Sequence, residues 1–252
     1  MKPLLKLENV CKSFGGVVTA DNVCLDVFPR EVHGLIGPNG AGKTTLLNLI
    51  SGIYSADSGR IFLGDIEITK IPSHDRAKMG IARTFQSPRF LTRSSIWDNL
   101  MMGIDLANKF SYTASFLGRK GSELKDELHH LLEMAELSFD WDDDISSLPY
   151  GRQKLLEIIR AMLSKPRIML VDEPAAGLNQ REIENAIAII NYAAKEQDVG
   201  ILLIEHSMDM IMSISHNITV INFGVVIGEG SPEIVSKNEE VVAAYLGRRK
   251  DA

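Results

Sequence analysis

The sequence is poor in features that would each point to a particular class of protein. It has only two cysteines in 252 residues, Cys11 and Cys24, and neither belongs to a C-x-x-C pair. This usage argues against a disulfide-built fold or a cysteine zinc site, and we expect no disulfide between the two thiols. The 27 Lys and Arg residues are outnumbered by 33 Asp and Glu residues, which gives a net charge of −6. We therefore expect no nucleic-acid partner, because nucleic-acid binders usually present a basic face.

Long apolar runs are also absent from the sequence. The most apolar stretches, residues 200–204 and 220–227, are far too short to span a bilayer. Residues 1–8 lack the continuous apolar segment of a secretory signal, so none is expected. We also find no internal repeat and no low-complexity segment. If the protein works at a membrane, another chain is expected to supply the membrane-spanning part.

What the sequence does contain is a complete G-x-x-x-x-G-K-[ST] phosphate-binding loop at residues 37–44. The apolar run 32–36 predicts a buried strand before this loop, and residues 44–50 predict a helix after it. The loop then lies at a helix N-terminus, where the helix dipole and free N–H groups favour an anion. Lys43 can reach the β- and γ-phosphates of a nucleotide, and the Thr44 hydroxyl can ligate Mg²⁺. The predicted nucleotide contacts are Gly37, Pro38, Asn39, Gly40, Ala41, Gly42, Lys43, Thr44 and Thr45. We conclude that the protein binds a nucleoside triphosphate.

Apolar patterning predicts a single domain over residues 1–252 with an α/β fold. The opening residues alternate apolar and polar side chains, which is typical of half-buried antiparallel strands. The unbroken apolar runs 168–171 and 201–204 are typical of parallel strands covered on both faces. We therefore predict a P-loop NTPase core with a mainly parallel sheet, built from residues 1–93 and 166–252, and an N-terminal antiparallel β part.

An α-helical subdomain is predicted as an insertion in this core, over residues 94–165. Leucines at helical spacing indicate helices over 123–137 and 151–163. Residues 108–122 are expected to form an exposed excursion, and the aspartate-rich residues 140–144 a solvated loop.

Polar residues follow the predicted strands at the points where catalytic groups are expected. Asp172 and Glu173 end one buried strand, at the edge of an open α/β sheet where ligands bind. Asp172 is placed to hold Mg²⁺, and Glu173 to orient or deprotonate an attacking water. His206 ends a second buried strand at the same edge, where its imidazole can donate to a γ-phosphate or position water. Gln86 follows another predicted strand and can reach Mg²⁺ or the water from a hinge into the helical part.

Two further positions are candidates for nucleotide contacts. Phe14 lies beside a glycine turn and can stack on a base, although core packing explains an aromatic there equally well. The turn at residues 148–153, here called the signature turn, leads into an amphipathic helix whose N-terminus is a second anion site. Two such sites in one chain are explained if the second one serves the nucleotide of a neighbouring subunit.

In this order, the motifs resemble the complete motif series of an ABC-type ATPase, over essentially the whole chain. They comprise the loop at 37–44, Gln86, the signature turn, Asp172-Glu173, the segment 176–179 and His206. The resemblance implies two ATP and two Mg²⁺ sandwiched between two head-to-tail subunits. Pro149, Tyr150 and Gly151 would then face the partner's γ-phosphate, and Asn179 would lie across the dimer seam.

The resemblance also implies a role for each group. Lys43 holds phosphates, while Thr44, Gln86 and Asp172 arrange Mg²⁺. Glu173 is the catalytic base, and His206 stabilises the γ-phosphate; Lys43, Gln86, Glu173 and His206 together form the catalytic set. Closure of the dimer would move the helical part and drive membrane partners.

This sequence departs from the usual family motifs at two positions. The family signature usually reads Leu-Ser-Gly-Gly-Gln, whereas this chain has Pro149 in place of the serine and Tyr150 in place of the first glycine. The serine hydroxyl contact with the γ-phosphate is thereby lost. Asn179 stands where an aspartate is usual. None of these changes touches Lys43 or Glu173, so ATP hydrolysis is expected to survive.

The Leu-x-Tyr-Gly-x-Gln signature resembles the first ATP-binding subunit of branched-chain amino-acid importers. Residues 81–86, 228–232 and 241–247 are similar to that group as well. The implied partners are a second ATP-binding subunit, two transmembrane permease subunits and, indirectly, an extracytoplasmic solute-binding protein. The implied location is peripheral, on the cytoplasmic face of the cell membrane. Related importers of urea, short amides or aromatic acids are the main alternative, and a soluble ABC-type ATPase of iron–sulfur cluster assembly is a more distant one.

Overall fold

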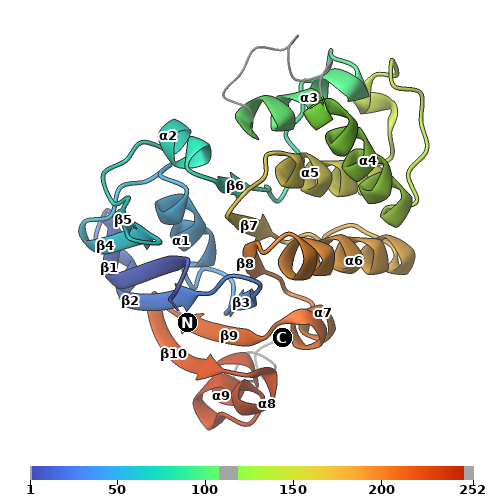
Figure 1. Cartoon of the computed structure of the whole chain (residues 1–252). Coiled ribbons are helices and arrows are strands. Elements are labelled where there is room, and N and C mark those ends of the chain that lie inside the picture. The colour runs from blue at the N-terminus through green and yellow to red at the C-terminus, as the bar shows by residue number, and fades with distance from the viewer. Residues whose placement is uncertain (1, 108–118, 247–252) are drawn as a thin grey trace.

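A six-stranded sheet forms the centre of the computed structural model, which describes residues 2–107 and 119–246 (Figure 1). The strand order is β10-β9-β3-β8-β7-β6, and all neighbours are parallel except the antiparallel pair β9 and β10. Its strands are β3 (Val32–Ile36), β6 (Ile81–Arg83), β7 (Ile168–Asp172), β8 (Gly200–Ile204), β9 (Asn217–Asn222) and β10 (Val225–Gly230). The prediction of a mainly parallel sheet is confirmed.

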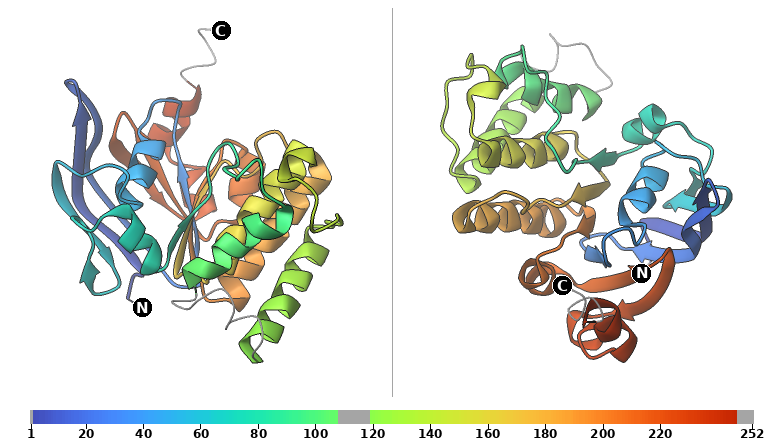
Figure 2. Two further views of the ribbon diagram at one scale, coloured as in Figure 1. Left: turned by 90° about the horizontal axis from the view of Figure 1, so that it is seen from above. Right: turned by 180° about the vertical axis from the view of Figure 1, so that it is seen from behind.

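A second, antiparallel sheet is built mainly from the N-terminal strands, in the order β2-β1-β4-β5. Its strands are β1 (Leu5–Phe14), β2 (Val17–Val27), β4 (Ser58–Leu63) and β5 (Ile66–Glu67). Seen from above, this sheet and the helical part lie on opposite sides of the central sheet (Figure 2). The predicted N-terminal antiparallel part is therefore confirmed as well. Cys11 and Cys24 lie on β1 and β2 as free thiols.

Each face of the central sheet has its own apolar core. On one face, Leu202 and Ile204 pack in a cluster with α1 (Lys43–Ile50) and the antiparallel sheet. On the other face, Ile201 and Leu203 pack in a cluster with the helices. Because successive side chains of a strand point to opposite faces, a strand covered on both faces is apolar throughout. This explains the unbroken apolar runs in the sequence.

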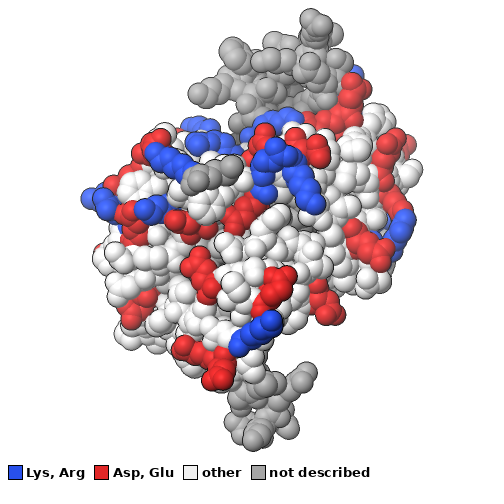
Figure 3. Space-filling model, turned by 60° about the horizontal axis from the view of Figure 1, so that its bottom comes forward, with Lys and Arg blue, Asp and Glu red and all other residues white. Residues whose placement is uncertain are grey.

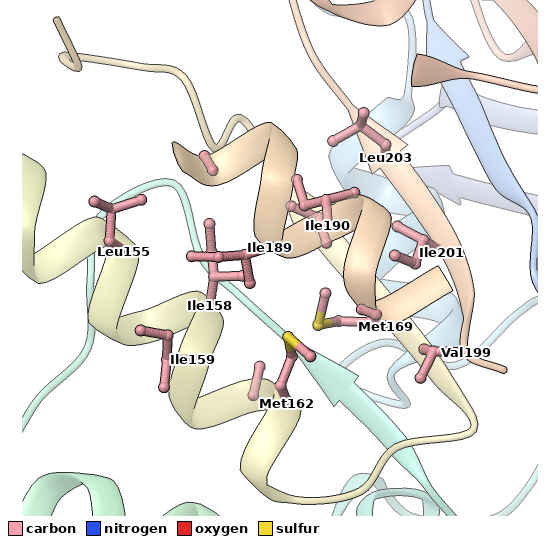
Figure 4. Close-up of a cluster of buried hydrophobic side chains, with 14 of the residues drawn as sticks. Leu155, Ile158, Ile159, Met162, Met169, Ile189, Ile190, Val199, Ile201 and Leu203 are labelled. Carbon is pink, nitrogen blue, oxygen red and sulfur yellow. The ribbon is translucent and has the colours of Figure 1, made fainter. Parts of the chain in front are cut away.

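The helical part contains α3 (Ile96–Ala107), α4 (Arg119–Met134), the short 3₁₀ helix Ile145–Ser147 and α5 (Tyr150–Leu163). It joins the core through α5, which packs on α6 (Gln180–Glu196) (Figure 4). Figure 4 shows Ile158 and Met162 of α5 directed toward Ile189 of α6 and Met169 of β7. This continuous core attaches the signature turn, which runs into the first turn of α5, to strand β7, which ends at Asp172 directly before Glu173.

Several boundaries differ from those predicted from the sequence. Helix α4 ends at Met134 rather than at residue 137, and Glu136 has a left-handed φ of 53°, so the chain leaves the helix there. The stretch 220–227 forms parts of the hairpin β9–β10. Local patterning did not single out α2 (Ser73–Lys78), α8 (Pro232–Val235) or the helix α9 (Glu239–Leu246). Most of the predicted excursion 108–122 lies outside the described residues, as does Gly247 of the motif 241–247.

The surface shown in Figure 3 carries Lys and Arg side chains interspersed with Asp and Glu side chains. Residues 140–144 form a turn whose aspartates are all exposed, as predicted. No helix within residues 2–107 or 119–246 is both long and apolar enough to cross a membrane.

Candidate functional site: a strand-end cluster between two open helix termini

The phosphate-binding loop connects β3 to α1, as the sequence predicts. Gly42 stands at the N-cap of α1 with a φ of +108°, and a Cβ there would lie 2.1 Å from the carbonyl oxygen of Thr19. Only glycine therefore fits this position. Lys43 is buried, and its Nζ donates to the carbonyl oxygens of Gly37 at 2.7 Å and Pro38 at 3.1 Å. The loop thus holds the lysine ammonium close to its own backbone.

The N-terminus of α1 has no side-chain cap. N–H groups in the first turn of a helix otherwise need a capping partner or a ligand. Together with the ammonium of Lys43, they form a donor set that fits the phosphates of a nucleotide. Thr44, the next residue, is exposed, so its hydroxyl is available for a metal or phosphate oxygen.

Three of the predicted catalytic groups meet at the carboxyl edge of the central sheet. Strands β7 and β8 are parallel, with Asp172 opposite Ile204, so Glu173 and His206 emerge next to each other. Glu173 Oε1 lies 2.8 Å from His206 Nε2, and Glu173 Oε2 accepts from Gln86 Nε2 at 2.9 Å. Because an ionised carboxylate only accepts, Nε2 is the protonated ring nitrogen in this contact. The structure therefore brings the predicted base, the histidine and the hinge glutamine into one cluster.

The backbone at Glu173 is unusual, since its φ is 48° in a non-glycine residue. Its N–H donates to the carbonyl oxygen of Ile204 at 2.9 Å, which fixes this conformation against β8. Left-handed backbone costs a non-glycine residue on the order of 1 kcal/mol, and such residues cluster at functional sites. The carboxylate is thus aimed by a locally strained, well-anchored residue.

Asp172 is the residue before Glu173, and it is buried. Burial raises the pKa of its carboxyl above the ordinary value, while the guanidinium of Arg83, 3.5 Å away, opposes this rise. Mg²⁺ prefers oxygen ligands such as carboxylate, hydroxyl and amide oxygens. Asp172, Thr44 and Gln86 can each supply one of these, so their chemistry fits a magnesium ion.

Sequence reasoning missed the role of Glu205, which precedes His206 and is buried. Its carboxylate accepts from the backbone N–H groups of Ala175 at 2.7 Å, His206 at 2.6 Å and Ser207 at 2.9 Å. These bonds join the segment after β7 to the segment after β8. An acidic residue between a buried apolar strand and a candidate catalytic histidine was the available signal in the sequence.

The signature turn forms the second open helix terminus. Pro149 is the N-cap of α5, no side chain caps this helix, and both Pro149 and Tyr150 are exposed. The Tyr150 hydroxyl donates to the carbonyl oxygen of Gln86 at 3.0 Å. Gly151 is buried, and a Cβ there would lie 2.3 Å from Glu182 Oε1. The turn therefore contacts the hinge glutamine and the start of α6.

Asn179 caps that neighbouring helix, α6. Its side chain accepts from the N–H of Glu182, and its own N–H donates to the Glu182 carboxylate at 3.0 Å. Asparagine thus fills the capping role that aspartate also fills. Whether Asn179 crosses a dimer seam stays a prediction.

Phe14 is 42 % exposed, so core packing, one of the two interpretations of this residue, is wrong. Its ring makes an edge-to-face contact with Tyr54, with centroids 5.2 Å apart. Base stacking by Phe14 stays a prediction.

Comparison with known proteins adds two family matches. Residues 20–176 match the ABC transporter model, and residues 225–251 match the model described as branched-chain amino acid ATP-binding cassette transporter. Two curated relatives are similar over nearly their whole length. The high-affinity branched-chain amino acid transport ATP-binding protein BraF of Pseudomonas aeruginosa is 38 % identical over 251 residues, 98 % of each chain. LivG of Escherichia coli, which bears the same description, is 38 % identical over 252 residues, again 98 % of each chain.

A solved structure is similar as well. It is the ADP conformation of an ATP-binding cassette of an ABC transporter, with a TM-score of 0.82 and 30 % sequence identity, covering 98 % of this chain and 100 % of that one.

Proposed function

The chain belongs to the ABC transporter family, and from this premise we propose that it powers an importer of branched-chain amino acids. Members of this family are nucleotide-binding ATPase subunits that dimerise and work with membrane permeases, and this chain is one of them. The solute class is supported above all by one observation. The last described strand and the residues after it, 225–251, match a model specific to branched-chain amino acid transporters.

In the proposed mechanism, the phosphates of ATP bind at the N-terminus of α1. The loop N–H groups and the Lys43 ammonium hold them, and Lys43 turns from its carbonyl partners toward the β- and γ-phosphates. These donors are in place before the reaction, so they stabilise developing charge without a reorganisation cost.

Thr44, Gln86 and Asp172 would hold Mg²⁺ at the same edge. When bound, the ion neutralises charge on the phosphate oxygens. Glu173 takes a proton from the attacking water, because each of its oxygens keeps a second lone pair beside its present partner. The half-exposed His206 swings its Nε2–H from Glu173 to the γ-phosphate and stabilises the transition state.

Two open helix termini support the assignment of two half-sites to one chain. In a head-to-tail dimer, the α1 terminus of one subunit and the α5 terminus of the other would enclose one ATP. Pro149, Tyr150, Gly151 and Asn179 would line the partner's nucleotide, and Phe14 would stack on the base of the chain's own nucleotide. We place the dimer, with two permease subunits, peripherally on the cytoplasmic face of the membrane, served by an extracytoplasmic solute-binding protein.

The permease is proposed to bind a cavity of about 690 Å³ between the core and the helical part. Its lining combines apolar side chains with arginines, and it includes Phe85, next to the hinge glutamine. An occupant of this cavity would move with the helical part. The lining includes Ile53, Ala77, Phe85, Arg89, Met102 and Arg160.

Photo-cross-linking in membranes, with a benzophenone maleimide attached to a single introduced cysteine, tests this contact. Met102→Cys, in a background with Cys11 and Cys24 replaced by serine, should cross-link to the permease. Val242→Cys on α9, which is similarly exposed at the opposite end of the molecule, is the control (Figure 1). Equal cross-linking of both variants would contradict the placement.

The central test of catalysis is Glu173→Gln in the purified chain. We expect ATP turnover to fall by about 10²–10⁴-fold, as is usual for loss of a general base. ATP should still bind and should shift the variant to a dimer in size-exclusion chromatography with light scattering. Glu184→Gln on α6 is a matched control, and unchanged turnover in Glu173→Gln would remove this residue as the base.

The solute is tested by purifying the tagged chain with its membrane partners and measuring ATP turnover of the reconstituted complex. Leucine, isoleucine or valine, with the solute-binding protein, should stimulate turnover. Stimulation by urea, short amides or aromatic acids alone would reassign the solute. Recovery with a soluble scaffold and no permease would overturn the transport role.

A further inference from the structure

Helix α5 carries three polar side chains along one side, two of them buried. Tyr150, Lys154 and Glu157 are spaced i, i+4 and i+7, which places them on one side of an α-helix. Lys154 and Glu157 are each only 1 % exposed. We call these three residues the polar stripe of α5.

All three residues of the polar stripe bind one short segment, residues 85–89, which contains the hinge glutamine. The Tyr150 hydroxyl donates to the carbonyl oxygen of Gln86 at 3.0 Å, and Lys154 Nζ donates to that of Phe85 at 3.1 Å. Glu157 Oε1 accepts from the N–H groups of Phe85 and Arg89, both at 3.3 Å. The backbone on both sides of the Gln86 side chain is thus attached to α5.

The stripe also reaches the catalytic strand. Lys154 Nζ donates to the carbonyl oxygen of Glu173 at 3.0 Å. Gln86 and Glu173, whose side chains are hydrogen-bonded to each other, are therefore both held through their backbones by the same helix. The tyrosine ring further lies against the segment after β7, since a Cβ on Gly177 would be 3.0 Å from Tyr150 Cε1.

Such a stripe is costly for stability. A buried lysine and a buried glutamate each lose hydration, and apolar residues at these positions would fold at least as well. The second carboxylate oxygen of Glu157 has no hydrogen-bond partner within the described residues. A polar set that the packing does not require indicates a role outside packing.

We propose that Tyr150, Lys154 and Glu157 are positioning residues, which make the Gln86 segment and the Glu173 backbone follow the movement of the signature helix. This inference rests on the proposed function. The N-terminus of α5 would touch the ATP bound to the partner, while Gln86 and Glu173 act on the chain's own ATP. The stripe therefore couples the two nucleotide sites of the dimer, and the differential contacts at α5 supply the coupling free energy.

The test is Tyr150→Phe, which removes one hydroxyl and keeps the ring. Loss of one hydrogen bond is expected to lower kcat by about fivefold to tenfold. KM should change little, and the Hill coefficient for ATP should fall toward one. Tyr192→Phe on α6 is the matched control, because its hydroxyl accepts a hydrogen bond from Gln197 Nε2 at 3.0 Å, at a distance from the site. Unchanged kcat and Hill coefficient in Tyr150→Phe would overturn the proposal.

A double-mutant cycle with Gln86→Ala separates positioning from a general structural effect. If Tyr150 acts through the hinge glutamine, Tyr150→Phe should lower kcat little further once the Gln86 side chain is gone. An equal loss in both backgrounds would overturn the proposal. Lys154→Met should lower kcat and the Hill coefficient as Tyr150→Phe does, while Lys195→Met, at an exposed position, is the control. If Lys154→Met does not fold, the Tyr150→Phe result alone tests the proposal.

The same assay keeps this inference apart from the proposed function. Absence of ATP hydrolysis in the wild-type chain, alone and with its membrane partners, would refute the function. Normal hydrolysis that depends on Glu173, together with a Tyr150→Phe variant that behaves as wild type, would refute only the coupling.

Discussion

The N-termini of α1 and α5 are both open to an anion, but they are built differently. Neither has a side-chain cap, whereas Asn179 and Ser207 cap α6 and α7 (Met208–Ile214). The α1 terminus is enclosed by backbone, because the atom that excludes a side chain at Gly42 is the carbonyl oxygen of Thr19. Its geometry is therefore fixed by the antiparallel sheet.

At the α5 terminus, by contrast, the excluding group at Gly151 is the carboxylate of Glu182, the far end of a flexible side chain. The hydroxyl of Tyr150 provides the link to Gln86. A terminus held by side chains can adjust its position, while one held by backbone cannot. This suits a rigid site for the chain's own phosphates and an adjustable surface for a partner's nucleotide.

The largest expected effect tests the rigidity of the first terminus. Gly42→Ala would place a methyl group 2.1 Å from a backbone oxygen at a φ of +108°. We expect ATP binding by the purified chain, measured by titration calorimetry, to be lost. Gly40→Ala has a φ of +79° but nothing within 4 Å of the new methyl, so it should cost only about 1–2 kcal/mol of backbone strain. Similar losses in both variants would contradict the backbone enclosure.

The next largest effect concerns Glu157, which attaches α5 to the segment 85–89, and the dependence of stability on pH. Burial raises the pKa of Glu157 from 4.5 to about 7, while Lys154, Arg160 and the N–H groups of Phe85 and Arg89 oppose the rise. The folded chain therefore holds this proton more tightly than the unfolded chain. The resulting stabilisation is complete below pH 4.5 and is lost as pH rises to about 7.

Glu157→Gln has no charge to bury, so it should lack this loss. The difference in unfolding free energy between variant and wild type should shift toward the variant by about 3 kcal/mol between pH 4.5 and 8, and level off above pH 7. Urea titrations at several pH values measure it. A difference that does not change with pH would show that Glu157 is not buried as described.

A smaller effect tests the adjustable terminus. Gly151→Ala should displace the Glu182 carboxylate, break its capping box with Asn179, and lower stability by about 1–2 kcal/mol. Gly151→Ala should also lower ATPase activity, because the new methyl group disturbs the α5 terminus. Since the obstacle is the Glu182 side chain, adding Glu182→Ala should restore that activity. Failure of this rescue would mean that the second terminus is as rigid as the first.

The smallest effect follows from the missing cap itself. Pro149→Ser places a capping hydroxyl at the start of α5 and should preserve or raise ATPase activity, with a gain in stability of up to about 1 kcal/mol. Thermal unfolding and steady-state turnover measure the two. A collapse of turnover would show that the proline itself is needed.

Much of this architecture is predictable from the sequence because its signals are local. The loop at 37–44 and the apolar runs of β7 and β8 are each continuous in the sequence. Because parallel strands end at the same edge of a sheet, Asp172 and His206 are expected to lie at one edge. Lys154 and Glu157 were not predicted as site residues. Their role depends on which segment of the chain packs against α5, and the apolar periodicity of a helix does not identify that segment. The only indication in the sequence was the presence of two charged residues on a helix face with apolar flanks.

Boundaries were less predictable where tertiary contacts decide them. The strand β6 ends at Arg83, so Phe85 and Gln86 are free of the ladder and available to α5. The exposure of Phe14 likewise depends on where the end of the β1–β2 hairpin lies relative to the rest of the fold. The alternation of apolar and polar residues along these strands does not determine that position.

The ladder between β7 and β8 has a consequence for how this chain tolerates change over evolutionary time. Glu173 and His206 are 33 residues apart in the chain, yet the β7–β8 ladder, which ends with Asp172 opposite Ile204, brings them next to each other. The connection between them passes through α6 and a turn at Asp198, whose φ is 56°. Insertions or deletions at that turn would leave the catalytic pair in register. The length of this connection and the register of the catalytic pair are therefore set by separate parts of the structure.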